Sequence, residues 1–225
     1  GPPRAEKTMT EGRMPPVPET TSKTVSRKRQ QTRQRLLDAA LTAFADDGFG
    51  RTTVERVCEE AGFTRGAFYS NFTSLDELFL VAWEQKSTEL VQGLRAAFDA
   101  EPPDAGIPVA EALAQVLDHV PADSEWHRVS LEFTAHALRN PELRQVVAAR
   151  EAAIIGAILP IVTQLLERAG RTVTDPEALG HALVAIHDGT LAQCLLEPDD
   201  EAPWVRRREL FLHVLLSYTT EESPT

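Results

Sequence analysis

The sequence predicts an all-α fold of about nine helices. Apolar residues recur at i, i+3 and i+4 through most of the chain, and this spacing places them along one side of a helix. Proline and glycine interrupt the pattern at intervals that suit separate helices, as at Pro102, Pro103 and Gly106. No alternation of apolar and polar residues is long enough to indicate a strand. We therefore expect helices packed on helices throughout.

Three helices are expected in the N-terminal part, over residues 32–78. The first begins near Thr32 and ends near Gly48, which suits a left-handed C-cap. The Thr-x-x-Glu spacing at Thr52–Glu55 is that of a capping box, so a second helix begins there. Gly62 supplies the turn that follows, and the hydroxyl of Thr64 can cap a third helix.

Six longer helices are expected in a second, larger domain, residues 79–225. A capping box at Ser74–Glu77 opens the fourth helix, which proline and glycine end after residue 101. Pro141 and Pro176 suit the first position of later helices, whereas Pro160 lies inside one and should kink it. The helices after the fourth are expected at about 108–119, 125–139, 141–170, 175–196 and 203–218.

Basic residues gather near the N-terminus, although the net charge of the chain is −11. Six basic residues and no acidic ones lie between Thr21 and Arg35. Over residues 21–72, nine basic and six acidic residues give +3, which leaves −14 for the rest of the chain. This distribution is typical of a molecule that presents one end to a polyanion. Residues 1–31 lack an apolar period, so we expect them to form a disordered basic arm.

The segment TVERVCEEAGFTRGAFYSNF predicts a helix-turn-helix that binds DNA. In such a pair the second helix enters the major groove with its first turn near the base edges. Arg65 is the best candidate to read a base, because a guanidinium can bond O6 and N7 of guanine together. Gly66 and Ala67 let the helix approach closely. An ordinary helical hairpin with a solvated polar face is the alternative, which the basic residues upstream make less favoured.

The run TRQRLLDAALTAFADDGFGRTTVERVCEEAGFTRGAFYSNFTSLDELF resembles the N-terminal domain of TetR-family transcriptional regulators. The resemblance spans residues 32–79 and includes the AALxxFxxxGFxxTT element and the AGFTRGAFYxxF segment. Two positions depart from the family pattern. Leu75 stands where the family usually has a phosphate-binding Lys, and Asn71 stands where many members have His. The missing cation implies weaker or differently placed phosphate contacts.

The resemblance implies a three-helix DNA-binding domain that helix four joins to a larger helical domain. The larger domain is expected to bind a small effector and to dimerise through its last two helices. Thr53 and Tyr69 are expected to contact phosphates, and the first turn of the third helix to face the bases. The complete set of expected DNA-binding residues is Arg33, Thr52, Thr53, Thr64, Arg65, Gly66, Ala67, Tyr69, Ser70 and Asn71.

The effector pocket is expected among helices four to eight. Each of its candidate residues has an alternative role as ordinary core. His181 and His187 are six residues apart and point to different helix faces, so we expect neither a metal site nor a cofactor. The two cysteines are expected to be buried thiols. The candidate pocket residues are Phe98, Trp126, Phe133, Ile155, Leu159, Val184 and His187.

These observations predict a cytoplasmic homodimer that binds double-stranded DNA. The most favoured function is a repressor released from a palindromic operator by a small hydrophobic effector. A DNA-binding dimer without a small ligand, acting architecturally or through a protein partner, is the alternative. An enzyme is not expected, because no nucleophile with a base and an orienting group is recognisable. No membrane span is expected either, since no run of 18 apolar residues exists.

Overall fold

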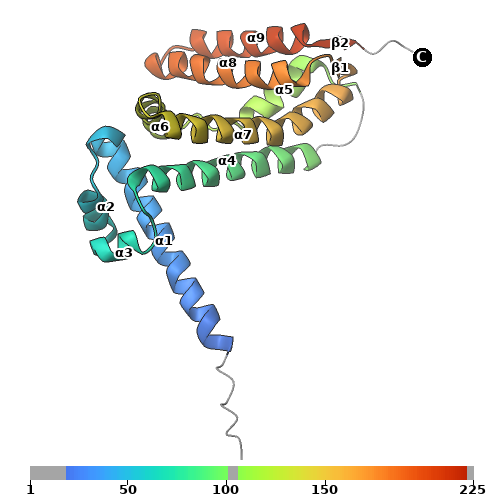
Figure 1. The fold of residues 1–225 in the computed structure, drawn as a ribbon. Coiled ribbons are helices and arrows are strands. Elements are labelled where there is room, and N and C mark those ends of the chain that lie inside the picture. Colours follow the sequence, from blue (N-terminus) through green and yellow to red (C-terminus); the bar gives the residue numbers. More distant parts are fainter. Residues whose placement is uncertain (1–18, 101–105, 222–225) are drawn as a thin grey trace, which may run out of the picture.

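The computed structural model describes residues 19–100 and 106–221, and over these ranges the chain is almost entirely helical (Figure 1). A short 3-10 helix, Phe49–Arg51, follows the first α-helix. The predicted all-α fold is confirmed. The elements are α1 (Glu19–Asp47), α2 (Val54–Ala61), α3 (Arg65–Tyr69), α4 (Leu75–Ala100), α5 (Val109–Asp118), α6 (Ser124–Ala137), α7 (Pro141–Arg168), β1 (Arg171–Val173), α8 (Pro176–Leu196), α9 (Ala202–Ser217) and β2 (Thr219–Glu221).

Helix α1 begins earlier than the sequence pattern indicated. The expected start was Thr32, but the helix runs from Glu19, so residues 19–31 are helical and the prediction of a disordered arm was wrong for them. Residues 1–18 lie outside the described ranges. The apolar period marks only the part of α1 that packs against other helices. The preceding turns are rich in Arg, Lys and Gln, which are good helix formers, and adding turns to an existing helix is far easier than starting one.

The predicted caps at Gly62 and Thr64 are confirmed, but the predicted capping box at Thr52–Glu55 is wrong, because Thr53 is the N-cap of α2 and the hydroxyl of Thr52 bonds the carbonyl of Gly48 instead. The hydroxyl of Thr53 accepts a hydrogen bond from the N–H of Arg56, and the hydroxyl of Thr64 accepts one from the N–H of Ala67. Gly62 has φ 68°, a left-handed conformation in which a side chain would be strained. These local contacts fix where α2 ends and where α3 begins.

The helices after α3 form layers above the N-terminal helices α1, α2 and α3 (Figure 1). Helix α4 lies against α7, α7 lies against α8, and α8 pairs with α9. Helix α5 crosses between α7 and α9. Two three-residue strands, which the sequence pattern did not reveal, pair antiparallel with Arg171 opposite Glu221. They close the end of the bundle and are too short to show an alternation.

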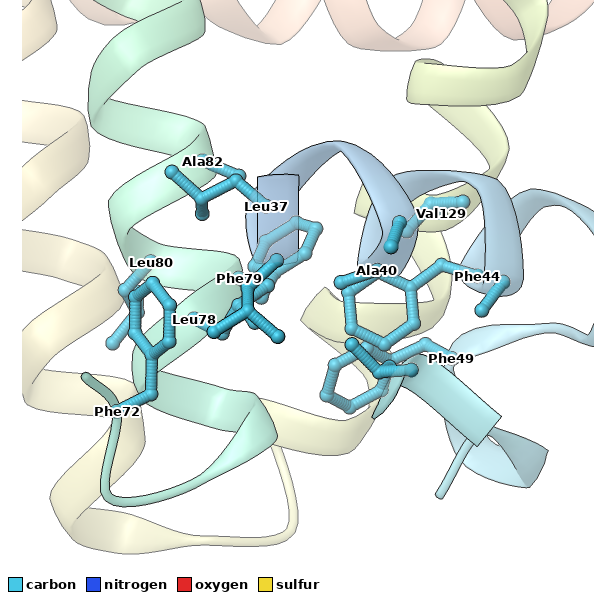
Figure 2. Packing of buried hydrophobic residues seen from close by; sticks show 14 of the residues in the cluster. Leu37, Ala40, Phe44, Phe49, Phe72, Leu78, Phe79, Leu80, Ala82 and Val129 are labelled. Atoms are coloured by element: carbon cyan, nitrogen blue, oxygen red, sulfur yellow. The ribbon is translucent and has the colours of Figure 1, made fainter. Parts of the chain in front are cut away.

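One hydrophobic core joins the N-terminal helices α1 to α4 to α6 (Figure 2). Phe49 and Phe79 lie in it together with Val129 and Phe133 of α6. The ring of Phe133 stacks on Phe79 at a centroid distance of 4.0 Å and meets Phe49 edge-on at 5.0 Å. The expected division of the chain after residue 78 therefore crosses a continuous core. A second core lies among α5, α7, α8 and α9.

Helix α7 is long and apolar enough to cross a bilayer, by length and composition alone. Its most apolar 18-residue window has a mean hydropathy of 1.8, and 17% of that window is buried. The helix packs on α4, α6 and α8. Many of its apolar side chains, including Ile155 and Leu159, line a cavity, which accounts for much of its hydrophobicity.

Helices α7 and α8 approach closely at Gly180. A Cβ atom added to Gly180 would lie 2.4 Å from Cγ2 of Ile155, a branched side chain with little rotameric freedom. We expect Gly180→Ala to lower the free energy of unfolding by about 1 kcal/mol, because overpacking outweighs the gain in helix propensity. Ile155→Leu removes Cγ2 at equal volume and should restore stability in the double variant. Urea titrations check this, and an additive double variant would contradict it.

Candidate DNA-binding face and effector cavity

The short helix α3 presents most of the residues expected to contact DNA. Thr64, Arg65, Gly66, Tyr69 and Ser70 are exposed, Tyr69 to 50% of its surface. The core side of the same helix is anchored by Phe68, which is fully buried. One face of α3 is thus held by the core, and the other is free to meet a duplex.

Arg65 is oriented by neighbours from α2 and α3. One of its guanidinium nitrogens lies 2.6 Å from the carboxylate of Glu55, and its side chain remains 62% exposed. The guanidinium also lies 5.9 Å from the centre of the Tyr69 ring. A solvent-exposed ion pair of this kind contributes little to stability and separates easily. The contact therefore orients the guanidinium while leaving it available to an external acceptor.

Two arginines of α1 bind the C-terminal end of α3. Arg29 donates to the carbonyl of Ser70 at 3.3 Å, and Arg33 donates to the carbonyl of Asn71 at 2.6 Å. The guanidinium of Arg33 also lies 4.3 Å from the centre of the Phe72 ring. Arg33, expected at the DNA, thus has a structural role in positioning α3. The role of Arg29 was missed because it depends on residues 41 positions apart meeting in space.

Thr52 does not belong to the exposed face. Its side chain is buried, and its hydroxyl lies 2.8 Å from the carbonyl of Gly48 and 3.3 Å from that of Ala43. Thr53, the next residue, is exposed at the start of α2, as expected of a phosphate contact. Adjacent residues in an extended segment point to opposite sides, and here one of them satisfies the end of α1.

The last two candidates bond locally. The hydroxyl of Ser70 and the amide nitrogen of Asn71 both donate to the carbonyl of Ala67, at 2.9 and 2.8 Å. Leu75, which stands in place of the family's usual Lys, is half-buried against the core of the DNA-binding helices. An apolar contact therefore occupies the position where a cation was expected.

A partly open cavity of about 610 Å³ is lined by the six helices from α4 to α9. Five of the seven residues expected in the effector pocket line it, namely Trp126, Ile155, Leu159, Val184 and His187. Its size is that of a site for a drug-sized molecule, and its walls are mostly apolar.

Phe98 and Phe133 do not line this cavity. Phe133 is fully buried in the core shared with the DNA-binding helices. Phe98 lies beneath the guanidinium of Arg168, which is 3.6 Å from the ring centre. Helical periodicity identifies the inward side of a helix, but it does not show which neighbours a side chain on that side meets.

A buried arginine organises the polar corner of the cavity. Arg207 donates to the hydroxyl of Thr190 at 2.6 Å and to the carbonyl of His187 at 3.1 Å. It also lies 3.0 Å from Nδ1 of His187. Arginine can only donate, so Nδ1 accepts and Nε2 carries the proton of a neutral imidazole. Burial, aided by the charge of Arg207, lowers the pKa of His187 to about 4.

This lowered pKa predicts a loss of stability in acid. The unfolded chain binds a proton at His187 below its ordinary pKa of 6.5, whereas the folded protein resists it until about 4. Between about pH 7 and 5.5 this difference removes about 1 kcal/mol from the free energy of unfolding. His127 acts in the same direction, and Asp188, whose pKa is raised, opposes it. Urea titrations should show a shallower pH slope for His187→Asn, which keeps an acceptor for Arg207; equal slopes would contradict the assignment.

The two parts of the chain match two models of one family. Residues 36–82 match the model for bacterial regulatory proteins of the tetR family, and residues 108–216 match the C-terminal domain of BetI-type transcriptional repressors. The chain belongs to the TetR family. It is therefore related to DNA-binding transcriptional regulators, many of which are repressors.

Two curated relatives and two solved structures illustrate the relationship. The chain is 33% identical over 110 residues to the regulator AcrR of Shigella flexneri and spans about half (49%) of its length. It is 26% identical to TtgR of Pseudomonas putida, over 76% of this chain and 83% of TtgR. The structure of a TetR regulator from Haloarcula marismortui has a TM-score of 0.65 at 16% identity, covering 85% of this chain and all of that one. SmeT, the repressor of a Stenotrophomonas maltophilia multidrug efflux pump, has a TM-score of 0.57 at 23% identity, covering 87% and 99%.

In this TetR-family chain, α6 contacts both the cavity and the DNA-binding domain. Trp126 and Ser130 line the cavity. On its other side, Glu132 accepts a hydrogen bond from the N–H of Phe49 at 2.5 Å, and Arg128 donates to the carbonyl of Ala45. Ala45 lies in the last turn of α1, where helix carbonyls lack partners within the helix, and Phe49 begins the 3-10 helix that follows. Helix α6 therefore contacts the cavity on one side and the end of α1 with the following 3-10 helix on the other.

Proposed function

We propose that this protein is a dimeric repressor that a small, largely apolar effector releases from a palindromic operator. The observation that carries the proposal is the position of Trp126. This residue lines the cavity, and its ring stacks on Phe79 with centroids 5.3 Å apart and planes 11° from parallel. Phe79 is fully buried in the core of the DNA-binding helices. An effector against Trp126 is therefore one side chain away from that core.

The DNA-binding part of the proposal rests on the exposed face of α3. Thr53 and Tyr69 are proposed to hold phosphates, while Arg65, Gly66 and Ala67 face the base edges. Arg29 and Arg33 keep α3 in place. Their bonds to its C-terminal carbonyls connect the helix to α1. Such a regulator acts where the chromosome is, so a cytoplasmic location belongs to the proposal.

Dimerisation is proposed through α8 and α9. These helices pair with each other at the outer layer of the larger domain (Figure 1). Their outer sides carry exposed apolar residues, among them Leu196 (81% exposed), Val205 (41%) and Leu216 (38%). Apolar groups on a second face of a helix indicate a second packing partner. In a symmetric dimer the two α3 helices would lie about 34–36 Å apart, or at a related spacing, and meet two half-sites.

The mechanism follows from two arrangements of this dimer. The DNA-binding arrangement places both α3 helices at the operator spacing. An effector that fills the cavity better in another arrangement shifts the population toward it, because a ligand favours the state to which it binds more tightly. Helix α6 carries the change, through Trp126 on one side and Glu132 on the other.

The proposal is tested by selecting bound sequences from random DNA at low ionic strength and by measuring oligomeric state. A palindromic site bound by a dimer is expected. Leu216→Glu should weaken both dimerisation and DNA binding, whereas Leu138→Glu, at an exposed site beside α6, should change neither. A monomer that ignores every duplex would overturn the proposal.

The proposed release by a small effector needs a separate measurement. A compound that occupies the cavity should raise the melting temperature by mass action and lower affinity for the selected site. If the protein binds its palindrome but no apolar compound stabilises or releases it, the function is that of a DNA-binding dimer controlled by a protein partner or acting architecturally.

A further inference from the structure

The N-terminal turns of α1, residues 19–35, project beyond α2 and α3 and are called the α1 extension below (Figure 1). The side chains of residues 26–31 are all exposed, and the first buried side chain among those described in α1 is that of Leu36. From residue 26 the extension reads SRKRQQTRQR, so it has no apolar side. A helix that is polar all round gains little from packing and is only marginally stable in water, so this segment suits a polar partner.

The α1 extension carries positive charge that no acid in the described part of the chain neutralises. No acidic residue lies between residues 21 and 35. None of its basic residues forms an ion pair within 4 Å with a described residue. Three of them donate instead to backbone carbonyls, which are uncharged. The basic residues from residue 26 onward are Arg27, Lys28, Arg29, Arg33 and Arg35.

The extension passes the C-terminal end of α3. Arg29 and Arg33 share one side of α1 and donate to the carbonyls of Ser70 and Asn71 there. Residues 19–28 continue the helix past this point by about 15 Å, since a helix rises about 1.5 Å per residue. The major groove is only about 8.5 Å deep, so an extension of this length reaches past the groove that holds α3 to phosphates outside it.

Arg27 and Lys28 lie on sides of α1 that α3 does not occupy. Each residue turns by about 100° around a helix, which places Lys28 about 100° and Arg27 about 200° from Arg29. Both side chains are exposed. The side of the extension toward α3 is therefore used to position that helix, whereas these two cations remain available to a ligand beyond it.

We propose that the α1 extension is a second DNA contact, in which Arg27 and Lys28 bind phosphates outside the major groove that α3 enters. This inference rests on the DNA-binding part of the proposed function and is independent of any effector. An acidic protein or a membrane surface would also attract cations. The bonds of Arg29 and Arg33 fix the extension beside α3, however, so a duplex on the exposed face of α3 lies against the extension as well.

The test measures the affinity of the full chain for its selected palindrome and for a scrambled duplex of equal length over a range of salt concentrations. Arg27→Gln combined with Lys28→Gln removes two phosphate contacts per subunit and four per dimer. The slope of log affinity against log salt concentration should fall in magnitude by about three to four. The fold loss should be equal on both duplexes, because phosphates carry no sequence information. Arg27→Lys should keep the slope of the parent, since a phosphate contact needs the charge and not the planar fork.

A charge-matched control separates direct contact from long-range attraction. Arg139→Gln combined with Arg144→Gln changes the net charge by the same amount at the junction of α6 and α7, where both side chains are exposed. This variant should keep the slope and affinity of the parent. Hydroxyl-radical footprinting locates the contact: the parent should protect sugars beyond the stretch that α3 covers. The Arg27 and Lys28 double variant should lose this protection, and Arg65→Ala should keep it.

The outcomes separate this inference from the function on which it rests. An unchanged slope in the Arg27 and Lys28 double variant, or an equal fall in the control, would overturn the second contact and leave a protein that binds DNA through α3 alone. A loss confined to the palindrome would overturn it too, because the two residues would then read bases. If the parent binds no duplex, the DNA-binding function is wrong together with the inference.

Discussion

Replacing Phe133 with Ala is expected to lower the free energy of unfolding by about 3–5 kcal/mol. Phe133 is fully buried, and its ring contacts Phe79 at 4.0 Å and Phe49 at 5.0 Å between centroids. Truncation removes the buried apolar surface and leaves a cavity that α6 and the first two helices cannot close, because each is held by its own core contacts. Chemical denaturation of the folded protein measures the loss.

The same substitution should weaken the connection between effector and DNA. Phe133 belongs to α6 but packs among residues of the DNA-binding helices. A variant that still folds should therefore bind a cavity ligand with smaller loss of DNA affinity than the parent shows. Leu138→Ala, at a site that is 64% exposed beyond the end of α6, is the control and should change stability by less than about 0.5 kcal/mol. A Phe133→Ala protein as stable as this control would contradict the shared core.

Local chemistry explains which features were predictable from the sequence. The turn at Gly62 and the cap at Thr64 depend on one residue and its neighbours, so their positions could be specified to within a residue. The same holds for Asn140 and Asp175, whose side chains cap α7 and α8 directly before a proline. The exposure of the α3 residues was predictable too, because their spacing places them on the side of the helix opposite buried Phe68.

Long-range contacts explain what was missed. Nothing within a few residues of Phe133 shows whether its ring enters the cavity or the core shared with α1 and α4, because that depends on how α6 is placed. Thr52 and Thr53 are chemically alike, yet only the packing of α1 decides which of them is buried. Arg33 carries a charge suited to phosphate, but its guanidinium instead donates to the carbonyl of Asn71 at the end of α3.

Arg65→Ala is expected to weaken binding to the selected operator by about 1–3 kcal/mol, which is roughly 5- to 150-fold in Kd. The loss should be smaller on scrambled DNA, since a base-reading guanidinium contributes most where its guanine is present. Helix α3 should stay folded, because its cap at Thr64 and its core residue Phe68 are untouched. Titrations of labelled operator and scrambled duplexes at one fixed salt concentration measure both effects.

Two further variants distinguish base recognition from simple charge. Arg65→Lys keeps the cation but loses the planar pair of donors, so it should retain affinity for scrambled DNA and lose discrimination. Glu55→Gln removes the acid that lies 2.6 Å from Arg65, and it should leave discrimination largely intact because this exposed pair only orients the side chain. If Glu55→Gln behaves like Arg65→Ala, the ion pair itself is what matters. If Arg65→Ala discriminates operator from scrambled DNA as the parent does, another side chain on α3 reads the bases, and exposed Tyr69 is the next to test.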